Sequence, residues 1–504
     1  MRLLPVLDST RASAHHGAPA GESPGEPGSL GASLWEPESD QVASGTPWER
    51  RVYFEVFGCQ MNKLDAELMV GALRKAGYDF TDRDEEADAV LLVSCSIRDQ
   101  AEHRVRSHLG ALTAAKRERP GLSVGLLGCM AQREGERLLA RWPALDFVAG
   151  TRDFPQVARL LDRARSSGER SLAVDGSPQV SEERDPSVRP SRARAWVSVM
   201  RGCDKSCTYC VVPRTRGPEV SRPLADVVAE VQALVADGVV EVTLLGQTVN
   251  AWGRAEGRSL GDLLRRLQAL EGLERVRFIT SHPEEMDDAL IAAMAACDKC
   301  GLFLHLPPQS GSDRVLRRMA RGYTAARYRA IAASLRAAIP GVELGADIIV
   351  GFPGETAHDF GATRELVEEL RFSQAFVFRY SPRPGTPAWG RLADDVPESV
   401  KHERLLELQA LQARLQAERH AGLVGRVQRV LVEGVSRRDG SRLFGRSLPF
   451  DRLIFEGDAA LVDRFVDVRV TGCSPLTLFG ERVAPGDGTA GAPATAAAGV
   501  ATCP

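Results

Sequence analysis

The stretch Gly202-Cys203-Asp204-Lys205-Ser206-Cys207-Thr208-Tyr209-Cys210 carries three cysteines at CxxxCxxC spacing on one short loop. Thiolates this close in sequence suit a metal centre. A structural zinc site takes four ligands, and no fourth Cys or His lies nearby in the sequence, although a distant one would still fit zinc. A four-iron cluster held by three cysteines instead leaves one iron open to a cofactor. We therefore predict that Cys203, Cys207 and Cys210 are catalytic and hold a [4Fe-4S] cluster whose open iron takes S-adenosylmethionine, so that one electron can cleave its sulfonium.

The loop follows the first strand of a long alternation of strands and helices over 189–420. Six βα units in series predict a partial (β/α)6 barrel, in which catalytic residues lie at the carboxyl ends of strands. Helical patterns such as 224–237, 260–270, 325–338 and 357–370 separate the strands, and a charged helix at 399–420 closes the section. The expected strands are 196–200, 241–246, 276–280, 302–306, 345–350 and 375–380.

Polar residues follow several of these strands. Gln247, Ser281 and Gln309 stand at or just beyond strand ends and are predicted to contact the cofactor. The stretch from Gly351 to Glu355 resembles a phosphate-cradling loop but lacks the Gly-Lys-Ser/Thr ending of a P-loop. We expect it to contact the adenine side of the cofactor through its backbone.

A second group of cysteines precedes this section, within residues 50–166. Strands are expected at 52–57, 89–94 and 123–127, alternating with helices at 62–77, 99–117 and 132–142, which implies a parallel α/β domain. Parallel strands end on one edge of a sheet, where ligands bind in open α/β folds. Each of the three strands is followed at once by a cysteine, so three thiols should converge there as a second metal site: Cys59, Cys95 and Cys129. The alternative is that small buried cysteines merely fill strand ends.

The remaining segments complete the predicted domain order. Residues 421–484 show short β runs separated by Gly, Asp and Pro, which fits a small β-barrel of OB-like character. Residues 167–188 are predicted to be a polar linker. Low-complexity composition predicts disorder for an extension at 1–48 and a tail at 485–504.

Composition narrows the partners and the compartment. The net charge of −3 argues against a global attraction to nucleic acid, so RNA contacts would need local patches. The arginine-rich run from Arg184 to Arg222 is one candidate, or else a solvated linker. No run approaches the roughly 18 apolar residues of a membrane span, no secretion signal is present, and ten cysteines are too few for a disulfide scaffold. We expect a cytoplasmic protein that contacts no membrane.

Collinear motifs beyond the cysteine loop identify the chain, over roughly residues 50–483, as similar to the methylthiotransferase family of radical S-adenosylmethionine enzymes. The sequence departs from the family pattern at Ser206, Arg214, Thr248 and Pro308, none of which is a predicted ligand. The matching segments are Phe57-Gly58-Cys59-Gln60-Met61-Asn62, Val211-Val212-Pro213, Thr215-Arg216-Gly217, Ser221-Arg222-Pro223, Leu245-Gly246-Gln247, Thr280-Ser281-His282-Pro283, Gln309-Ser310-Gly311-Ser312 and Gly351-Phe352-Pro353-Gly354-Glu355-Thr356.

The resemblance implies two [4Fe-4S] clusters, the second one auxiliary and held by Cys59, Cys95 and Cys129, and two S-adenosylmethionine molecules per turnover. It implies a TRAM domain that grips tRNA at the anticodon stem-loop, and an activity that methylthiolates N6-dimethylallyladenosine at position 37. It also implies an electron donor such as flavodoxin or ferredoxin and a sulfur donor, and we expect a monomer. Two alternatives stay open: threonylcarbamoyladenosine as the substrate, or a non-catalytic iron–sulfur protein that binds RNA.

Overall fold

A computed structural model describes residues 7–8, 50–96, 99–176, 184–185, 188–189, 191–436 and 439–483. The chain forms two compact units. The first comprises residues up to 190 together with 200–205 and 211–222, and the second comprises 191–199, 206–210 and the chain from 223 onward. Within the described part, no helix is both long and apolar enough to cross a membrane. Most of the predicted extension at 1–48, and the predicted tail at 485–504, lie outside the described residues.

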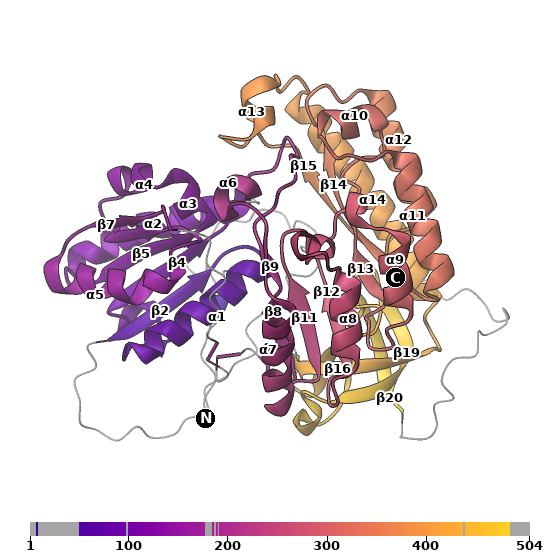
Figure 1. Ribbon diagram of the computed structural model, residues 1–504, viewed down its shortest axis with the longest axis horizontal. Helices are drawn as coiled ribbons and strands as arrows, with labels where there is room; N and C mark the ends of the chain where they lie inside the picture. Colours follow the sequence, from indigo (N-terminus) through magenta and orange to yellow (C-terminus); the bar gives the residue numbers. More distant parts are fainter. Residues whose placement is uncertain are drawn as a thin grey trace. The chain divides into compact units, whose positions relative to one another are not determined.

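The first unit is built on one parallel sheet, with strands in the order β1-β2-β4-β5-β6-β7 and β3 paired with the free edge of β2 beside β1 (Figure 1). Its central strands β4 and β5 are buried at every residue, as expected for a parallel sheet covered on both faces. The strands are β1 Leu7–Asp8, β2 Arg51–Val56, β3 Asp79–Thr81, β4 Ala89–Ser94, β5 Ser123–Gly128, β6 Phe147–Ala149 and β7 Ser171–Ala173.

Helices cover both faces of this sheet. Apolar side chains of α1 and α5 form one core with strand residues such as Phe54, and those of α2, α3 and α4 form another on the opposite face with residues such as Leu92. The predicted strands are confirmed, but the helix expected at 132–142 is two short helices that meet at Gly135. The helices are α1 Gln60–Lys75, α2 Asp99–Glu118, α3 Cys129–Glu134, α4 Glu136–Arg141 and α5 Val157–Ser167.

The predicted linker at 167–188 is wrong in its first part. Ser167 still belongs to α5, and β7 pairs with β6 from Phe147↔Ser171 to Ala149↔Ala173. The polar composition hid a short edge strand that needs few apolar side chains. Three further pieces of this unit come from later in the chain: β9 Met200–Arg201, α6 Val212–Arg216 and β10 Val220–Ser221.

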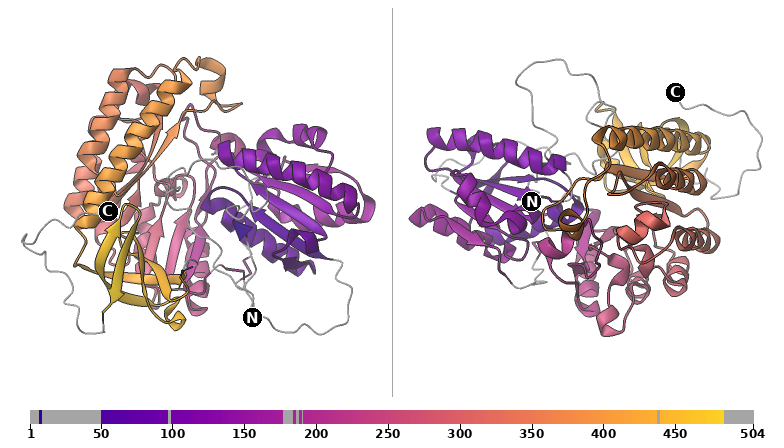
Figure 2. Two further views of the ribbon diagram at one scale, coloured as in Figure 1. Left: turned by 180° about the vertical axis from the view of Figure 1, so that it is seen from behind. Right: turned by 90° about the horizontal axis from the view of Figure 1, so that it is seen from above.

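The second unit contains the predicted partial barrel. Its six parallel strands form two three-stranded sheets, β12-β11-β8 and β13-β14-β15, and a bridge between Val276 and Cys300 lies at the point where they adjoin. Figure 2 shows the helices lined along the outside of these strands. The strands are β8 Arg194–Ser198, β11 Glu241–Leu245, β12 Arg275–Phe278, β13 Phe303–His305, β14 Glu343–Val350 and β15 Gln374–Arg379.

Most helices of this unit begin at a side-chain cap, whereas α7 and α14 begin after a proline. Ser259 and Thr356, for example, each form a capping box with the aspartate three residues on, which satisfies exposed backbone N–H groups at the first turn. The helices are α7 Leu224–Ala236, α8 Leu260–Gln268, α9 Asp288–Ala295, α10 Asp313–Arg318, α11 Ala325–Ala338, α12 Ala357–Leu370, α13 Pro387–Arg391 and α14 Glu398–Ala421.

After α14 the chain forms a closed five-stranded barrel in the order β16-β17-β18-β20-β19, which confirms the predicted small β-barrel. The sequence pattern missed β20, which closes the barrel by pairing with both β18 and β19. Closure leaves no open sheet edge. The strands are β16 Val427–Val435, β17 Arg442–Ser447, β18 Arg452–Glu456, β19 Phe465–Ser474 and β20 Thr477–Arg482.

Candidate functional site

The three cysteines Cys59, Cys95 and Cys129, called here the strand-end cysteines, follow neighbouring strands at one edge of the first sheet. β4 pairs with β2 on one side and with β5 on the other, all in parallel, so the three carboxyl ends lie together. Gly58 has φ +110°, and a Cβ added there would lie 2.8 Å from Cys95 Sγ. A glycine before Cys59 therefore allows the first strand end to approach the second thiol closely.

Asn62 and Ser94 hold these strand ends in place. The Asn62 amide donates to Phe57 O at 2.7 Å and to Ser94 O at 3.0 Å, which ties the end of β2 to the end of β4. The Ser94 hydroxyl donates to Leu127 O at 2.6 Å and so ties β4 to β5. The last residue of the Phe-Gly-Cys-Gln-Met-Asn motif is thus a structural clamp.

A buried arginine lies beside the strand-end cysteines. Arg216 ends α6, which packs against α3, the helix that begins at Cys129. Its Nη2 donates to Asn62 Oδ1 at 2.9 Å and to Asp65 Oδ2 at 2.8 Å. A hydrogen bond with Cys95 and the positive charge of Arg216 lower the pKa of Cys59 to about 6, against the effect of burial. Burial raises the pKa of Cys129.

Asp65 is shared by two arginines. It is fully buried on α1, and its other oxygen accepts from Arg201 Nη1 at 2.9 Å. Sequence reasoning missed Asp65 and gave Asn62 only as the end of a motif, although both lie on the apolar face of their helix, where a polar side chain needs a partner. The signal was available in the spacing of Asn62 and Asp65 with buried Ala66 and Met69.

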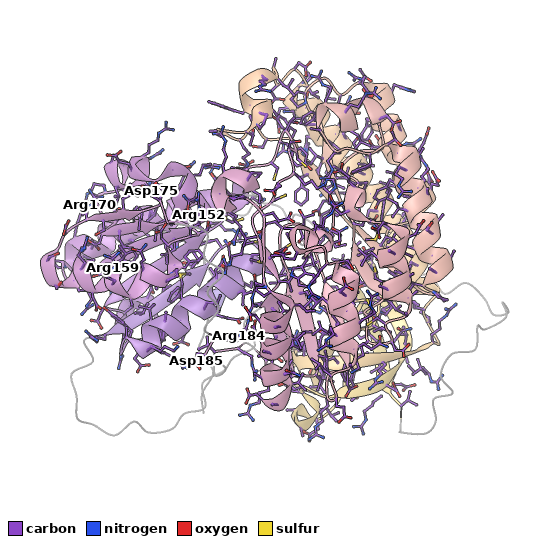
Figure 3. All side chains as sticks on the ribbon, viewed as in Figure 1. Arg152, Arg159, Arg170, Asp175, Arg184 and Asp185 are labelled. Carbon is purple, nitrogen blue, oxygen red and sulfur yellow. The ribbon has the colours of Figure 1, made fainter. Side chains whose placement is uncertain are left out.

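The arginine-rich run from Arg184 to Arg222 is only partly solvated, because several of its arginines are paired inside the protein. Arg184, labelled in Figure 3, pairs with Glu67 of α1, and Asp185 beside it pairs with Arg74. Arg194 pairs with Glu433 in the second unit. Arg184 and Arg194 therefore compensate carboxylates that are distant in sequence, and RNA binding by the rest of the run stays a prediction. Arg214 is exposed.

The three cysteines of the CxxxCxxC loop, called here the loop cysteines, are held by separate local contacts. In the first unit, Cys203 N–H donates to Gly217 O at 3.1 Å, and a Cβ on Gly202 would lie 1.8 Å from Pro218 O, so only glycine fits before Cys203. In the second unit, Cys210 N–H donates to Cys207 O at 3.0 Å in a tight turn.

Arg321 accompanies Cys207 in the second unit. Its Nη1 donates to Cys207 Sγ at 3.3 Å, and its Nη2 donates to Pro307 O at 3.1 Å. The Tyr209 ring, inside the CxxxCxxC loop, packs edge-on against Phe352. Neither Arg321 nor Tyr209 was singled out from sequence; Arg321 lies between α10 and α11, outside any motif.

The predicted cofactor contacts lie at the carboxyl ends of the barrel strands. Gln247 follows β11 and Ser281 follows β12. Within the described part of the chain, Gln247 Oε1 and Ser281 Oγ are buried and accept or donate no hydrogen bond. Thr280 and Gln309 adopt positive φ angles of 69° and 66°, a strained conformation that concentrates at functional sites. Unpaired buried polar atoms fit a polar ligand such as S-adenosylmethionine.

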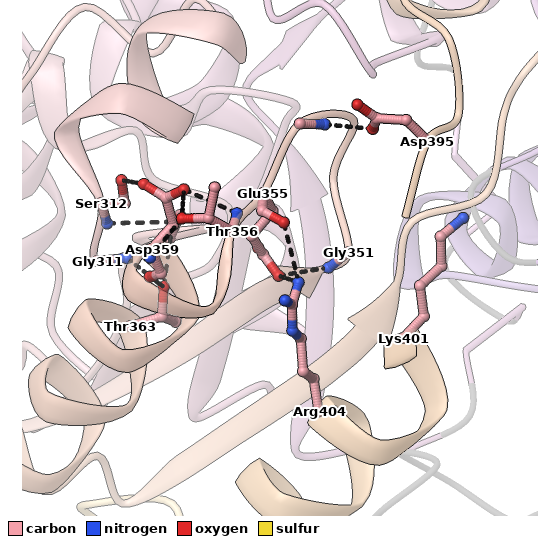
Figure 4. Close-up of polar contacts among 12 residues, drawn as sticks. Gly311, Ser312, Gly351, Glu355, Thr356, Asp359, Thr363, Asp395, Lys401 and Arg404 are labelled. Atoms are coloured by element: carbon pink, nitrogen blue, oxygen red, sulfur yellow. Dashed lines mark hydrogen bonds and ion pairs between the residues drawn. The ribbon is translucent and has the colours of Figure 1, made fainter. Parts of the chain in front are cut away.

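The Gly351–Glu355 loop is held mainly by its own chain (Figure 4). One oxygen of Glu355 accepts from Gly351 N–H at 2.8 Å and from Arg404 at 2.6 Å, so its carboxylate is already engaged. Thr356 then caps α12 and shares Asp359 with Ser312, which caps α10. These motif residues form the turn and two helix starts. Any cofactor contact here falls to the backbone, as we predict for Gly351.

Neither cysteine group forms a site for a single ion. Among the residues described, no three His, Cys, Asp or Glu side chains are placed to hold one metal ion. A [4Fe-4S] cube differs, because each thiolate binds a different iron. The chemistry of the donors, three thiols in each group, fits such a cluster.

The small barrel is anchored to the base of the partial barrel. Buried Glu241 of β11 accepts from Arg275 at 3.1 Å and Arg277 at 3.0 Å. Arg277 also donates to Ser447 O of the small barrel at 2.8 Å and lies over the Phe450 ring, while Arg275 lies over the Phe465 ring. Charge, hydrogen bonds and cation–π contacts therefore fix the small barrel to β11 and β12.

Comparisons with known proteins agree with this organisation. Residues 51–150 match the uncharacterized protein family UPF0004, 197–367 match the radical SAM superfamily and 422–483 match the TRAM domain. A radical S-adenosylmethionine methyltransferase from Kitasatospora setae shares the fold with a TM-score of 0.53 at 16% identity, over 75% of this chain and 78% of that one. The chain is thus a radical S-adenosylmethionine enzyme with a TRAM domain.

Curated relatives specify the family. The chain is 45% identical over 440 residues to tRNA-2-methylthio-N(6)-dimethylallyladenosine synthase of Geobacter metallireducens, covering 86% of this chain and 98% of the relative. It is 44% identical over 439 residues to the protein of the same name from Bordetella avium, covering 85% and 92%. The chain belongs to the family of tRNA-2-methylthio-N(6)-dimethylallyladenosine synthases. Family membership makes it a transferase with a [4Fe-4S] cluster and S-adenosylmethionine as cofactors, acting with tRNA.

Proposed function

We propose that this chain converts N6-dimethylallyladenosine at position 37 of tRNA, in the anticodon stem-loop, to its 2-methylthio derivative. The observation that carries the proposal is the near-complete coverage of relatives that bear this name, at 45% identity. Adenine C2 carries a hydrogen that acid–base groups cannot readily remove. Bound clusters and S-adenosylmethionine supply the radical and sulfur chemistry that this position requires.

The two cysteine groups divide the work in this proposal. Cys203, Cys207 and Cys210 hold the radical cluster, and the strand-end cysteines hold an auxiliary cluster that handles the inserted sulfur. Two local observations support the division: each group has three thiols, and each has a buried arginine bonded to or beside it. One S-adenosylmethionine would serve radical formation and a second would supply the methyl group.

The protein's own side chains have positioning roles in this proposal. Gln247 and Ser281 offer buried polar atoms to S-adenosylmethionine. Gln309 contributes backbone at a strained position, and Gly351 contributes backbone at a positive φ that glycine accommodates. Glu355 acts through its bond to Gly351 N–H. The TRAM barrel, fixed to β11 and β12, would hold the tRNA at a constant distance from the mouth of the partial barrel.

The test combines a metal count with nucleoside analysis. Anaerobic reconstitution should give about eight irons per chain, as two four-iron clusters require; about four would remove one group as a site. Mass spectrometry of tRNA nucleosides from a deletion strain should show loss of the 2-methylthio mark from the dimethylallyl nucleoside, restored by the intact gene. Loss from the threonylcarbamoyl nucleoside alone would overturn the proposed substrate.

Formation of 5′-deoxyadenosine by the reduced, reconstituted protein separates the enzyme from a non-catalytic RNA-binding protein. Several further expectations stay predictions. They are the monomeric state, the cytoplasmic location, flavodoxin or ferredoxin as reductant, a separate sulfur donor, and the domain limits of 50–166, 189–420 and 421–484.

A further inference from the structure

Arg216 carries a hydrogen-bond donor that the protein leaves unused. Its Nη2 serves Asn62 and Asp65. Its Nη1, in contrast, is buried and has no hydrogen-bond partner among the residues that the structure describes. Buried nitrogens of a guanidinium normally find an acceptor. This donor is therefore free for a further acceptor, and the same guanidinium already acts as a hydrogen-bond donor that lowers the pKa of Cys129, against the larger effect of burial.

The same arginine belongs to a network with an excess of positive charge. In the described chain, Asp65 is the one carboxylate to which the guanidiniums of Arg216 and Arg201 bond. One carboxylate neutralises one of two guanidiniums, the buried one of Arg216 and the partly buried one of Arg201, and an uncompensated charge away from water is costly. An anion beside Arg216 would remove that cost.

The nearest groups that can become anionic are the strand-end cysteines. Asn62, which accepts from Arg216, also lies 3.9 Å from Cys59 Sγ through the same Oδ1 atom. α6, which carries Arg216, packs on α3, which begins at Cys129. The strand end before Cys95 is bound to Asn62 through Ser94 O. Cys59 and the strand end before Cys95 are thus linked to Arg216 through Asn62, and Cys129 is linked to it by the packing of α6 on α3.

We propose that Arg216 is a positioning residue for the auxiliary cluster, whose Nη1 donates a hydrogen bond to a sulfur of that cluster and raises its reduction potential. The inference rests on the proposed function, which places a cluster on the strand-end cysteines. Hydrogen bonds to cluster sulfurs and nearby positive charge favour the reduced, more negative state. Asp65 orients the guanidinium and leaves one edge for the cluster.

The α6 helix offers a matched comparison. Arg214 stands two residues earlier on the same helix and is exposed, so it shares the sequence neighbourhood of Arg216 without its burial. Arg216→Lys keeps a positive charge for Asp65 and removes the forked donor. Arg216→Gln removes the charge as well. Arg214→Lys and Arg214→Gln are the controls.

The test measures the auxiliary cluster alone. In the full chain with Cys203→Ala, Cys207→Ala and Cys210→Ala, anaerobic reconstitution should load about four irons, and redox titration followed by electron paramagnetic resonance gives one midpoint potential. We expect a more negative potential for Arg216→Lys and a still more negative one for Arg216→Gln, with both Arg214 controls unchanged.

Unchanged potentials in both Arg216 variants, with iron content intact, would overturn this inference and leave the proposed function standing; that is the result if water fills the Nη1 position. If the triple-alanine chain binds no iron, the auxiliary cluster and this inference fall together. If Arg216→Gln fails to fold, Arg216→Lys decides the matter, because its ammonium can still pair with Asp65.

Discussion

The two cysteine groups are built differently, although each lies beside a buried arginine. At the strand-end cysteines the thiols come from three separate strands, and Arg216 is paired with a buried carboxylate, Asp65. At the loop cysteines the thiols come from one short segment, and Arg321 bonds a thiol, tyrosine hydroxyls and a carbonyl. A group assembled from strands that are distant in sequence needs clamps such as Asn62, whereas a loop is already assembled by its spacing.

The largest expected effect separates the two groups by their chemistry. Cys203→Ala should abolish both 5′-deoxyadenosine formation and methylthiolation, because it removes a ligand of the radical cluster. Cys59→Ala should abolish methylthiolation and leave 5′-deoxyadenosine formation in place. Liquid chromatography with mass spectrometry measures both products. If Cys59→Ala also stopped cleavage of S-adenosylmethionine in a folded protein, the division of labour would be wrong.

The next effect concerns the carboxylate that only the strand-end group possesses. Asp65→Asn should cost about 3–5 kcal/mol of the free energy of unfolding, since it leaves the buried guanidinium of Arg216 and the partly buried one of Arg201 without a counter-charge. Chemical denaturation of the chain without clusters measures this loss of stability, as a shift of the first unfolding transition to lower denaturant concentration. Glu85→Gln, at an exposed carboxylate, is the control and should leave that transition in place. If Asp65→Asn shifted that transition as little as Glu85→Gln does, the two arginines would be compensated by other groups.

A substitution of Arg321 tests the role of the buried arginine at the loop cysteines. Arg321→Lys loses the forked donor that reaches Cys207 Sγ and Pro307 O, and should lower the rate of 5′-deoxyadenosine formation about 10–100-fold, the usual effect of removing a partner of a metal ligand. Iron on the strand-end cysteines should be retained. Arg317→Lys, on the neighbouring helix α10, serves as a control that should keep the wild-type rate.

The smallest effects come from two glycines of the first unit. Gly58→Ala should cost about 1–3 kcal/mol, because its φ of +110° strains an alanine and the new Cβ would meet Cys95. Gly110→Ala, in the interior of α2 with open space around it, should instead stabilise by roughly 0.5–1 kcal/mol. Thermal unfolding distinguishes the signs. Equal shifts in both variants would show that no close approach is needed at Gly58.

The sequence predicted the repeated units better than the parts that connect them. Strands with continuous apolar runs, such as β4, were found because burial on both faces leaves a clear pattern. The short edge strand β7 and the last strand β20 were missed, since few of their side chains are buried. An apolar sequence pattern reports burial of side chains, whereas β7 and β20 are held in place by backbone pairing with neighbouring strands.

For the candidate site, spacing predicted that the thiols of the strand-end group meet at one sheet edge, because strand direction alone determines it. It did not predict Asp65 with Arg216 or Cys207 with Arg321, which are 151 and 114 residues apart. Long-range ion pairs leave only a faint trace, a charged residue on an apolar helix face. The same lack of long-range information hid the carboxylate partners of Arg184 and Arg194.

The composition of the first unit limits how this chain can be cut. Because that unit takes in 200–205 and 211–222, a fragment that stops at 166 or at 190 would keep Asp65 but lose Arg201 and Arg216. Such a fragment would bury a lone carboxylate and expose the side of α3 that α6 covers. The part that bears the strand-end cysteines is therefore no transferable module, and gene fusion or shuffling at the apparent boundary should yield insoluble protein.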